Sequence, residues 1–267
     1  MAPVWLTTVL NDLRQAEEQL EALEDKLWAS RGQDLEWGVL TPSIDRKKLA
    51  RIPRQTKLEL ERRSIGMFQD LAKVFAPGEE GSRGDAIITL MVLRHYGAPT
   101  RLLDWTRHPL IAAHFACAGP DDKNGELWAF DYEAYELLGK QQWQDHPETT
   151  IDGSGTDDKF DAKLTAFSAD VVLDWFCCAF YPRGFPRQDE QKGYYSLTRL
   201  FDVDHAVAIA GLLRDPKLFH RYVVDVSIKV KLRKLLREKY GLWRGLLFPD
   251  SAGAAETARI EVFNEFS

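Results

Sequence analysis

Segments with helical character alternate with short strand-like runs along this chain, and that alternation constrains its fold more than any other feature. Lys47–Phe75 has the pattern of a strongly charged helix, and Val230–Tyr240 that of a basic helix capped by Gly241. Glu126–Tyr132 alternates like a strand, and Tyr222–Ile228 is rich in β-branched residues. The pattern predicts an α+β fold, with a mixed or antiparallel sheet flanked by helices in a single domain.

Two segments divide the 267 residues in this prediction. Residues 1–26 are expected to form an N-terminal amphipathic helix, and residues 27–267 to form the main domain. Between Val4 and Leu27 the apolar residues occur at helical spacing, while acidic residues and glutamines fill the other face. Such a helix packs on the body of the protein, and its outer face suits the docking of a protein partner.

Composition and end sequence argue against several classes of protein. No apolar run approaches the roughly 20 residues of a membrane-spanning helix, and residues 1–10 lack the features of a secretory signal. We therefore expect a cytoplasmic protein without a membrane partner. Three cysteines and six histidines offer neither a disulfide framework nor a zinc-binding motif, so no metal is expected. The net charge of −6 disfavours nucleic acid as a partner, although a local basic patch leaves that alternative open.

Apolar sequence on both sides encloses the polar segment His95–Thr106, whose sequence is HYGAPTRLLDWT. Polar groups in apolar surroundings cost roughly 1–3 kcal/mol each unless they are hydrogen-bonded. The segment is therefore either a ligand site or a structural network. In the structural alternative, Arg101 pairs with Asp104, and Thr106 caps a helix that Pro109 opens. Spacing alone does not separate the two.

The same segment, together with an Arg-Gly-Gln tripeptide earlier in the chain, resembles the FRG domain family. That family takes its name from a Phe/Tyr-Arg-Gly motif near its start, where this chain has Ser30 in place of the aromatic residue. The pieces that carry the resemblance are Arg31-Gly32-Gln33, His95–Thr106, the group Arg187, Gln191 and Gly193, and Leu247–Asp250. They extend over about residues 27–260. The family has been described mainly as a domain of unknown function, so the resemblance implies a fold more than an activity.

A second, weaker resemblance is to ADP-ribosyltransferases, and it lies in the order of the elements. These enzymes often begin their site with an Arg-Gly on a strand that contacts NAD. A hydroxyl-rich strand, a helix with an Ala-x-x-Phe-Ala pattern, a further strand and a loop with a catalytic glutamate follow. This chain offers, in that order, Arg31-Gly32, Trp105-Thr106, residues 112–116, Leu127–Phe130 and residues 187–191. The resemblance implies an ADP-ribosyltransferase-like core.

That resemblance also implies NAD as the substrate, with a nucleotide site whose residues have assigned roles. The catalytic residues would be Glu190, Gln191 and His95. The residues that bind the cofactor would be Arg31, Gly32, Gln33, Tyr96, Thr100, Arg101, Asp104, Thr106 and Arg187. A guanidinium would bind the pyrophosphate through paired donors, and a carboxylate would stabilise the ribosyl cation as nicotinamide leaves. The FRG-like position carries the neutral Gln191, and whether it or Glu190 takes the catalytic position stays open.

Two functions from different classes follow from these patterns. The first is an NAD-using ADP-ribosyltransferase-like enzyme or NAD glycohydrolase, which the resemblance sets in a bacterial toxin, effector or phage-defence system. The second is a non-catalytic module that binds a nucleotide or a protein within a larger defence or regulatory assembly. A metal-dependent nuclease is disfavoured, because Asp104 has no neighbouring carboxylate in its motif.

Overall fold

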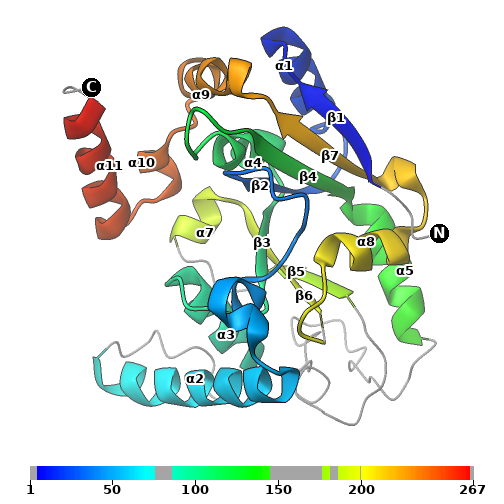
Figure 1. The fold of residues 1–267 in the computed structure, drawn as a ribbon, viewed down its shortest axis with the longest axis vertical. Coiled ribbons are helices and arrows are strands. Elements are labelled where there is room, and N and C mark those ends of the chain that lie inside the picture. The colour runs from blue at the N-terminus through cyan, green and yellow to red at the C-terminus, as the bar shows by residue number, and fades with distance from the viewer. Residues whose placement is uncertain (1–4, 76–85, 145–175, 181–185, 199, 265–267) are drawn as a thin grey trace.

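A single mixed sheet organises the protein (Figure 1). The structure, a computed structural model, describes residues 5–75, 86–144, 176–180, 186–198 and 200–264. The strands are β1 (Leu6–Leu10), β2 (Trp28–Gln33), β3 (Leu103–Thr106), β4 (Gly125–Asp131), β5 (Phe176–Phe180), β6 (Gly193–Thr198) and β7 (Phe219–Val224). They form one sheet in the order β1-β7-β4-β2-β3-β6-β5. β1 is parallel to β7 and every other neighbouring pair is antiparallel, which confirms the predicted α+β class with a mixed sheet.

Helices cover both faces of this sheet, as Figure 1 shows. The helices of the described residues are α1 (Leu13–Ala22), α2 (Arg54–Phe75), α3 (Ala86–His95), α4 (Pro109–Ala116), α5 (Tyr132–Gln144), α7 (Pro186–Glu190), α8 (His205–Leu213), α9 (Val226–Tyr240), α10 (Arg244–Leu247) and α11 (Ser251–Asn264), with short 3-10 turns η1 (Ser43–Asp45), η2 (Lys47–Arg51) and η4 (Pro216–Leu218). α1, α4 and α9 pack on one face, and α5 and α8 on the other. None of the described helices is both long and apolar enough to span a membrane.

β4 shows how the two faces are built, because its side chains alternate between them. Leu127 and Ala129 join the apolar cluster formed by α1, α4 and α9. Trp128 and Phe130 point the other way and pack with α8 and the start of α5. All seven residues of β4 are buried, so this strand lies at the centre of the core.

The continuous helix predicted between Val4 and Leu27 is wrong in its first part. Leu6–Leu10 is strand β1, which pairs in parallel with β7, and the helix covers only Leu13–Ala22. Asp12 separates the two, because its Oδ1 accepts the N–H of Gln15 at 2.9 Å and so caps α1. The pairing with β7 is a tertiary contact that local periodicity does not reveal. The apolar face of α1 is covered by α4 and α9.

Most other elements follow the sequence pattern, with two shifts at their ends. The helix predicted over Lys47–Phe75 is split into η2 and α2 at Pro53, because the residue before a proline disfavours helical geometry. The strand predicted over Tyr222–Ile228 ends at Val224, and α9 already begins two residues later. Gly241 ends α9 in the left-handed conformation with φ of 67°, as its capping role required.

The contact between α4 and β2 is unusually close at Gly32. A Cβ atom at Gly32 would lie 1.9 Å from the carbonyl oxygen of Ala112 and 2.6 Å from the amide nitrogen of Ala116. Both neighbours are backbone atoms and cannot rotate away. The glycine is therefore needed for packing rather than for backbone conformation, and it holds α4 directly on β2.

We predict that Gly32→Ala lowers the free energy of unfolding by about 3 kcal/mol, the upper end for an overpacked core. Urea denaturation measures the change. Gly66→Ala in α2 is the matched control, because an added Cβ there meets nothing within 4 Å. That control is expected to gain about 0.5–1 kcal/mol from helix propensity. Equal effects of the two substitutions would show that the α4 contact is not tight in solution.

Candidate functional site

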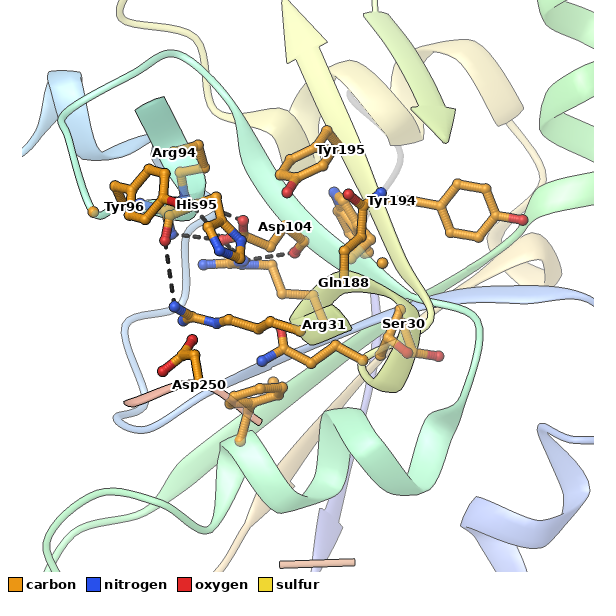
Figure 2. Close-up of a pocket in the computed structure, with 18 of the residues that line it drawn as sticks. Ser30, Arg31, Arg94, His95, Tyr96, Asp104, Gln188, Tyr194, Tyr195 and Asp250 are labelled. Carbon is orange, nitrogen blue, oxygen red and sulfur yellow. Dashed lines mark hydrogen bonds and ion pairs between the residues drawn. The ribbon is translucent and has the colours of Figure 1, made fainter. Parts of the chain in front are cut away.

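A pocket of about 730 Å³ opens beside β2, β3 and β6, and Figure 2 shows ten of its residues labelled. Its walls come from α3, α4, α7 and the start of α11. The lining residues are Ser30, Arg31, Gly32, Arg94, His95, Tyr96, Gly97, Asp104, Trp105, Thr106, Phe115, Arg187, Gln188, Gln191, Gly193, Tyr194, Tyr195, Asp250 and Ser251. The volume lies within the roughly 300–1,000 Å³ of small-molecule sites.

Arg31 enters the pocket where two strands separate. β2 and β3 pair in register at Ser30 and Thr106 alone over their described lengths, whereas β2 and β4 pair along six residues. Arg31 Nη1 reaches across the gap, donates to the carbonyl oxygen of Asp104 at 2.6 Å and lies 3.6 Å from Asp104 Oδ2. Its side chain is 10% exposed. The arginine predicted to bind a ligand is thus held at the wall of the pocket.

Asp104 forms its main ion pair with Arg94, at the end of α3. Arg94 donates through Nε at 2.9 Å and through Nη2 at 2.5 Å to the same carboxylate oxygen (Figure 2). Burial raises the pKa of the Asp104 carboxyl, but the charge and hydrogen bond of Arg94, with the charge of Arg31, hold it below its ordinary value. Burial also lowers the pKa of Arg31 to about 10, so its guanidinium stays protonated at neutral pH.

The predicted ion pair between Arg101 and Asp104 is wrong. Arg101 instead donates to the Glu61 carboxylate of α2, through Nε at 2.9 Å and Nη2 at 2.5 Å, and both side chains are 1% exposed. Its guanidinium also lies over the Phe201 ring, 3.9 Å from the centroid. Residues three apart on an extended chain point to opposite sides, which separates Arg101 from Asp104. Arg101 anchors α2 and does not line the pocket.

Two further residues predicted to bind the cofactor have structural contacts outside the pocket lining. Gln33 donates through Nε2 to Glu126 Oε1 at 2.7 Å and to the carbonyl oxygen of Val39 at 3.0 Å. Thr100 is fully buried, and its backbone N–H donates to Ser43 Oγ at 3.1 Å. Both residues shape the loops behind the site.

Thr106 lines the pocket, but its predicted role as cap of α4 needs correction. The capping position is His108, which makes no side-chain capping hydrogen bond. Thr106 Oγ1 accepts the N–H of His108 at 3.0 Å, one step before the helix begins at Pro109. The hydroxyl therefore fixes the turn between β3 and α4.

The predicted catalytic residues are divided between the pocket and the surface. His95 lines the pocket with Tyr96, and their rings meet edge to face with centroids 5.0 Å apart. Gln191 also lines it, and its Nε2 donates to the carbonyl oxygen of Leu247 at 2.8 Å, so this amide is tied to α10. Glu190 is exposed and is not among the lining residues.

α7 and the start of α11 supply the opposite wall. Arg187 Nη1 donates to the carbonyl oxygen of His95 at 3.3 Å, and its guanidinium lies 4.3 Å from the centroid of the Phe248 ring. Burial lowers the pKa of Arg187 despite the opposing charges of Asp250 and Asp104. Asp250 Oδ1 accepts the N–H of Gly253 at 2.7 Å. The charged lining residues are three arginines and two aspartates, so the pocket is cationic although the chain is acidic overall.

Several buried polar atoms of the pocket have no hydrogen-bond partner among the residues that the structure describes. They are Ser30 Oγ, Arg31 Nε and both amide atoms of Gln188. Ser30 is fully buried and Gln188 is 3% exposed. A buried polar group without a partner costs roughly 1–3 kcal/mol, so their concentration in one pocket indicates that a ligand or water completes them. Sequence reasoning missed Gln188, because nothing in the sequence separates it from the polar residues beside it.

Ser196 and His205 form a buried hydrogen-bonded pair, the combination of side chains that serves as nucleophile and base in some enzymes. Ser196 Oγ lies 2.8 Å from His205 Nδ1 and accepts the indole N–H of Trp105 at 2.7 Å. Both Ser196 and His205 are fully buried, and burial lowers the pKa of His205 to about 3. The pair is a neutral structural network. Within the described ranges, no cluster of three or more His, Cys, Asp or Glu side chains is placed to hold a metal ion.

Comparison with known proteins identifies one family. Residues 26–125 match the FRG domain, which confirms over that segment the resemblance carried by the central motif. The matched segment holds Arg31, Asp104 and Phe115 of the pocket. The wider boundary predicted at residues 27–267 stays a prediction. No match was found among curated proteins or among solved structures.

We predict that Asp104→Asn lowers the free energy of unfolding at pH 7 by about 1 kcal/mol, because the side chain is 42% exposed and its ion pairs are partly screened. The folded-state pKa of Asp104 lies below the unfolded value of about 3.9. Its contribution is therefore complete at neutral pH and is lost as the pH falls through the folded-state pKa. Urea denaturation at pH 7 and pH 3 measures it.

The control is Asp70→Asn on α2, whose side chain is 78% exposed beside Lys73. It is expected to change the free energy of unfolding little at either pH. A difference between the wild type and Asp104→Asn that stays constant from pH 7 to pH 3 would contradict the assignment of the ion pair.

Proposed function

We propose that the pocket binds a phosphate-bearing nucleotide, with NAD as the first candidate. The observation that carries the proposal is the convergence of Arg31, Arg187 and the unpaired polar atoms of Ser30 and Gln188 on one cationic pocket. Residues from both ends of the chain contribute to it, so a local structural network does not account for the arrangement. The chain would act first as a nucleotide-binding module.

Phosphate recognition would fall to the arginines. A guanidinium offers five donors in a planar fork and binds phosphate oxygens through two of them at once. Arg31 uses Nη1 toward Asp104 and keeps an unpaired Nε, and Arg187 stands on the facing wall. A dianionic pyrophosphate would be favoured by the excess of positive charge among the lining residues.

Aromatic rings of the pocket would receive the flat parts of a nucleotide. Phe115 of α4 and Tyr96, which follows α3, both line the pocket, and Tyr195 lines it from β6. Stacking of a base on an aromatic ring contributes roughly 1–3 kcal/mol and tolerates different bases. The combination of guanidinium groups and rings suits a nucleotide better than a simple phosphate ion or a peptide.

An ADP-ribosyltransferase-like enzyme or NAD glycohydrolase is the second candidate, favoured by the position of His95 and Gln191 in the same pocket as Arg31. Its weakness is the carboxylate that should stabilise a ribosyl cation. Asp104 is neutralised by Arg94 and Arg31, and among the described residues no glutamate lines the pocket. We therefore favour binding over cleavage. A place in a bacterial toxin, effector or antiphage defence system rests on the resemblance alone. A protein partner along α1 is proposed from the polar outer face of that helix.

We predict that the purified protein binds NAD and ADP-ribose, and that Arg31→Ala weakens both at least about tenfold, because a charge-assisted hydrogen bond contributes about 1.5–3 kcal/mol. Isothermal titration calorimetry measures the affinities. Arg14→Ala is the matched control, since Arg14 lies on α1 outside the pocket and is 88% exposed. Failure of the wild type to bind either nucleotide would contradict the proposal.

We further predict that incubation with NAD releases no free nicotinamide above the buffer background, as chromatography measures. Release that disappears in Arg31→Ala would replace the binding module by an NAD-cleaving enzyme. Glu190→Gln then tests the carboxylate. Full nicotinamide release by that variant would exclude Glu190 from the reaction. Loss of release would indicate that Glu190, exposed in this structure, takes part in cleavage of the glycosidic bond.

A further inference from the structure

We infer that Gln188 recognises a planar group that presents a hydrogen-bond donor and an acceptor side by side. The carboxamide of nicotinamide and the edge of adenine share this chemistry. The inference rests on the proposed nucleotide-binding function and assigns one part of the ligand to one side chain. It makes Gln188 a specificity-determining residue rather than a catalytic one.

The amide of Gln188 is buried and unmatched at both ends. The residue is 3% exposed, and within the described part of the chain neither Nε2 nor Oε1 has a hydrogen-bond partner. A side-chain amide carries two donors and one acceptor oxygen, and nearly all such buried groups find partners. Gln191, on the same wall, has its amide bound to the carbonyl oxygen of Leu247. The contrast points to a missing partner at Gln188 that a ligand supplies.

The sheet beneath Gln188 leaves room for its side chain. A Cβ atom at Gly193 would lie 3.1 Å from Gln188 Cγ, so the glycine lets the side chain lie over β6. Gly193 pairs with Thr106, and Thr106 pairs with Ser30, which gives one row across β6, β3 and β2. With strands about 4.8 Å apart, Ser30 lies roughly 10 Å from Gly193. Figure 2 shows Gln188 and Ser30 lining one pocket.

Because of this distance, the two ends of the row would bind two different groups of one ligand. Arg31 follows Ser30 in β2, so the end of the row at β2 offers a cation with an unpaired Nε and a hydroxyl. The end at β6 offers the neutral amide of Gln188. A phosphate suits the first end, and an uncharged planar group suits the second.

The hydrogen-bonding chemistry of the Gln188 amide restricts which uncharged planar groups it can bind. A glutamine binds an edge with one donor and one acceptor through two parallel hydrogen bonds, as it does with adenine. A carboxylate or phosphate presents acceptors alone and would leave Gln188 Oε1 unmatched. The terminal torsion of glutamine is soft, so the amide turns toward the cavity at little cost. The preferred partner is therefore a carboxamide or an aminopurine edge.

Two ligand pairs test this assignment and distinguish its sources. NAD is compared with its nicotinic acid analogue, in which only the carboxamide is changed, and with its hypoxanthine analogue. In the hypoxanthine analogue the N6/N7 edge of adenine, with one donor and one acceptor, becomes an O6/N7 edge with acceptors alone. The wild type is expected to bind NAD at least about tenfold more tightly than one analogue, measured by titration calorimetry. Preference in the first pair places nicotinamide at Gln188, and preference in the second places adenine there.

Gln188→Met keeps the length of the side chain and removes the amide, so the tenfold preference is expected to fall toward one. Its melting temperature is expected to rise by about 2–4 °C, because an unmatched buried amide is removed. Gln55→Met, at an exposed position of α2, is the control and should change neither quantity.

Equal binding of NAD and both analogues by the wild type would overturn the inference and leave the proposed function standing. A preference that persists in Gln188→Met, or a melting temperature that falls by more than about 5 °C, would also overturn it. In the latter case the amide has structural partners in solution. Absence of NAD binding would overturn both proposals.

Discussion

α4 connects β3 to β4, which lie on either side of β2, and the site depends on the close contact that α4 makes as it passes over β2. β3 and β4 both flank β2, and α4 connects them by passing directly over it. The helix is short and the connecting turn begins at Thr106, so α4 has to lie flat on the strand beneath. Gly32 makes that possible, because its missing side chain leaves the space that the backbone of Ala112 and Ala116 occupies. The position of Arg31, next in the strand, is fixed by the same contact.

Asp104 balances the positive charges of the pocket and holds two of its arginines in place, while one of them, Arg31, keeps a hydrogen-bond donor without a partner among the described residues. Asp104 draws Arg94 and Arg31 together, and Arg94 takes the larger share of its carboxylate. Without this aspartate, burial of neighbouring guanidinium groups would be opposed by their mutual repulsion. With it, Arg31 keeps one donor unpaired. Pre-organisation of this kind lowers the entropy lost when an anion binds.

Local patterns predicted most elements, and a contiguous motif predicted much of the site. The helix at 226–240, predicted from Val230 on, follows from periodicity and, at Gly241, from helix-capping rules. Arg31, His95 and Asp104 were predicted from motifs, and the pocket brings them together. The partners were not predictable, because Glu61 lies 40 residues from Arg101 in the chain. β1 was missed for the same reason, since its pairing partner lies near the other end of the chain.

The two walls of the pocket come from different parts of the chain, and this division has an evolutionary consequence. The segment that matches the FRG domain ends at residue 125, and it carries Arg31, Arg94 and Asp104. Gln188 and Asp250 belong to the chain beyond it. If the pocket binds the proposed nucleotide, substitutions in the second wall are expected to change which ligand is selected while the charged first wall is unchanged. On that proposal, a chain that keeps Arg31, Arg94 and Asp104 but differs after residue 125 would keep the charged wall and present a different ligand-selecting wall.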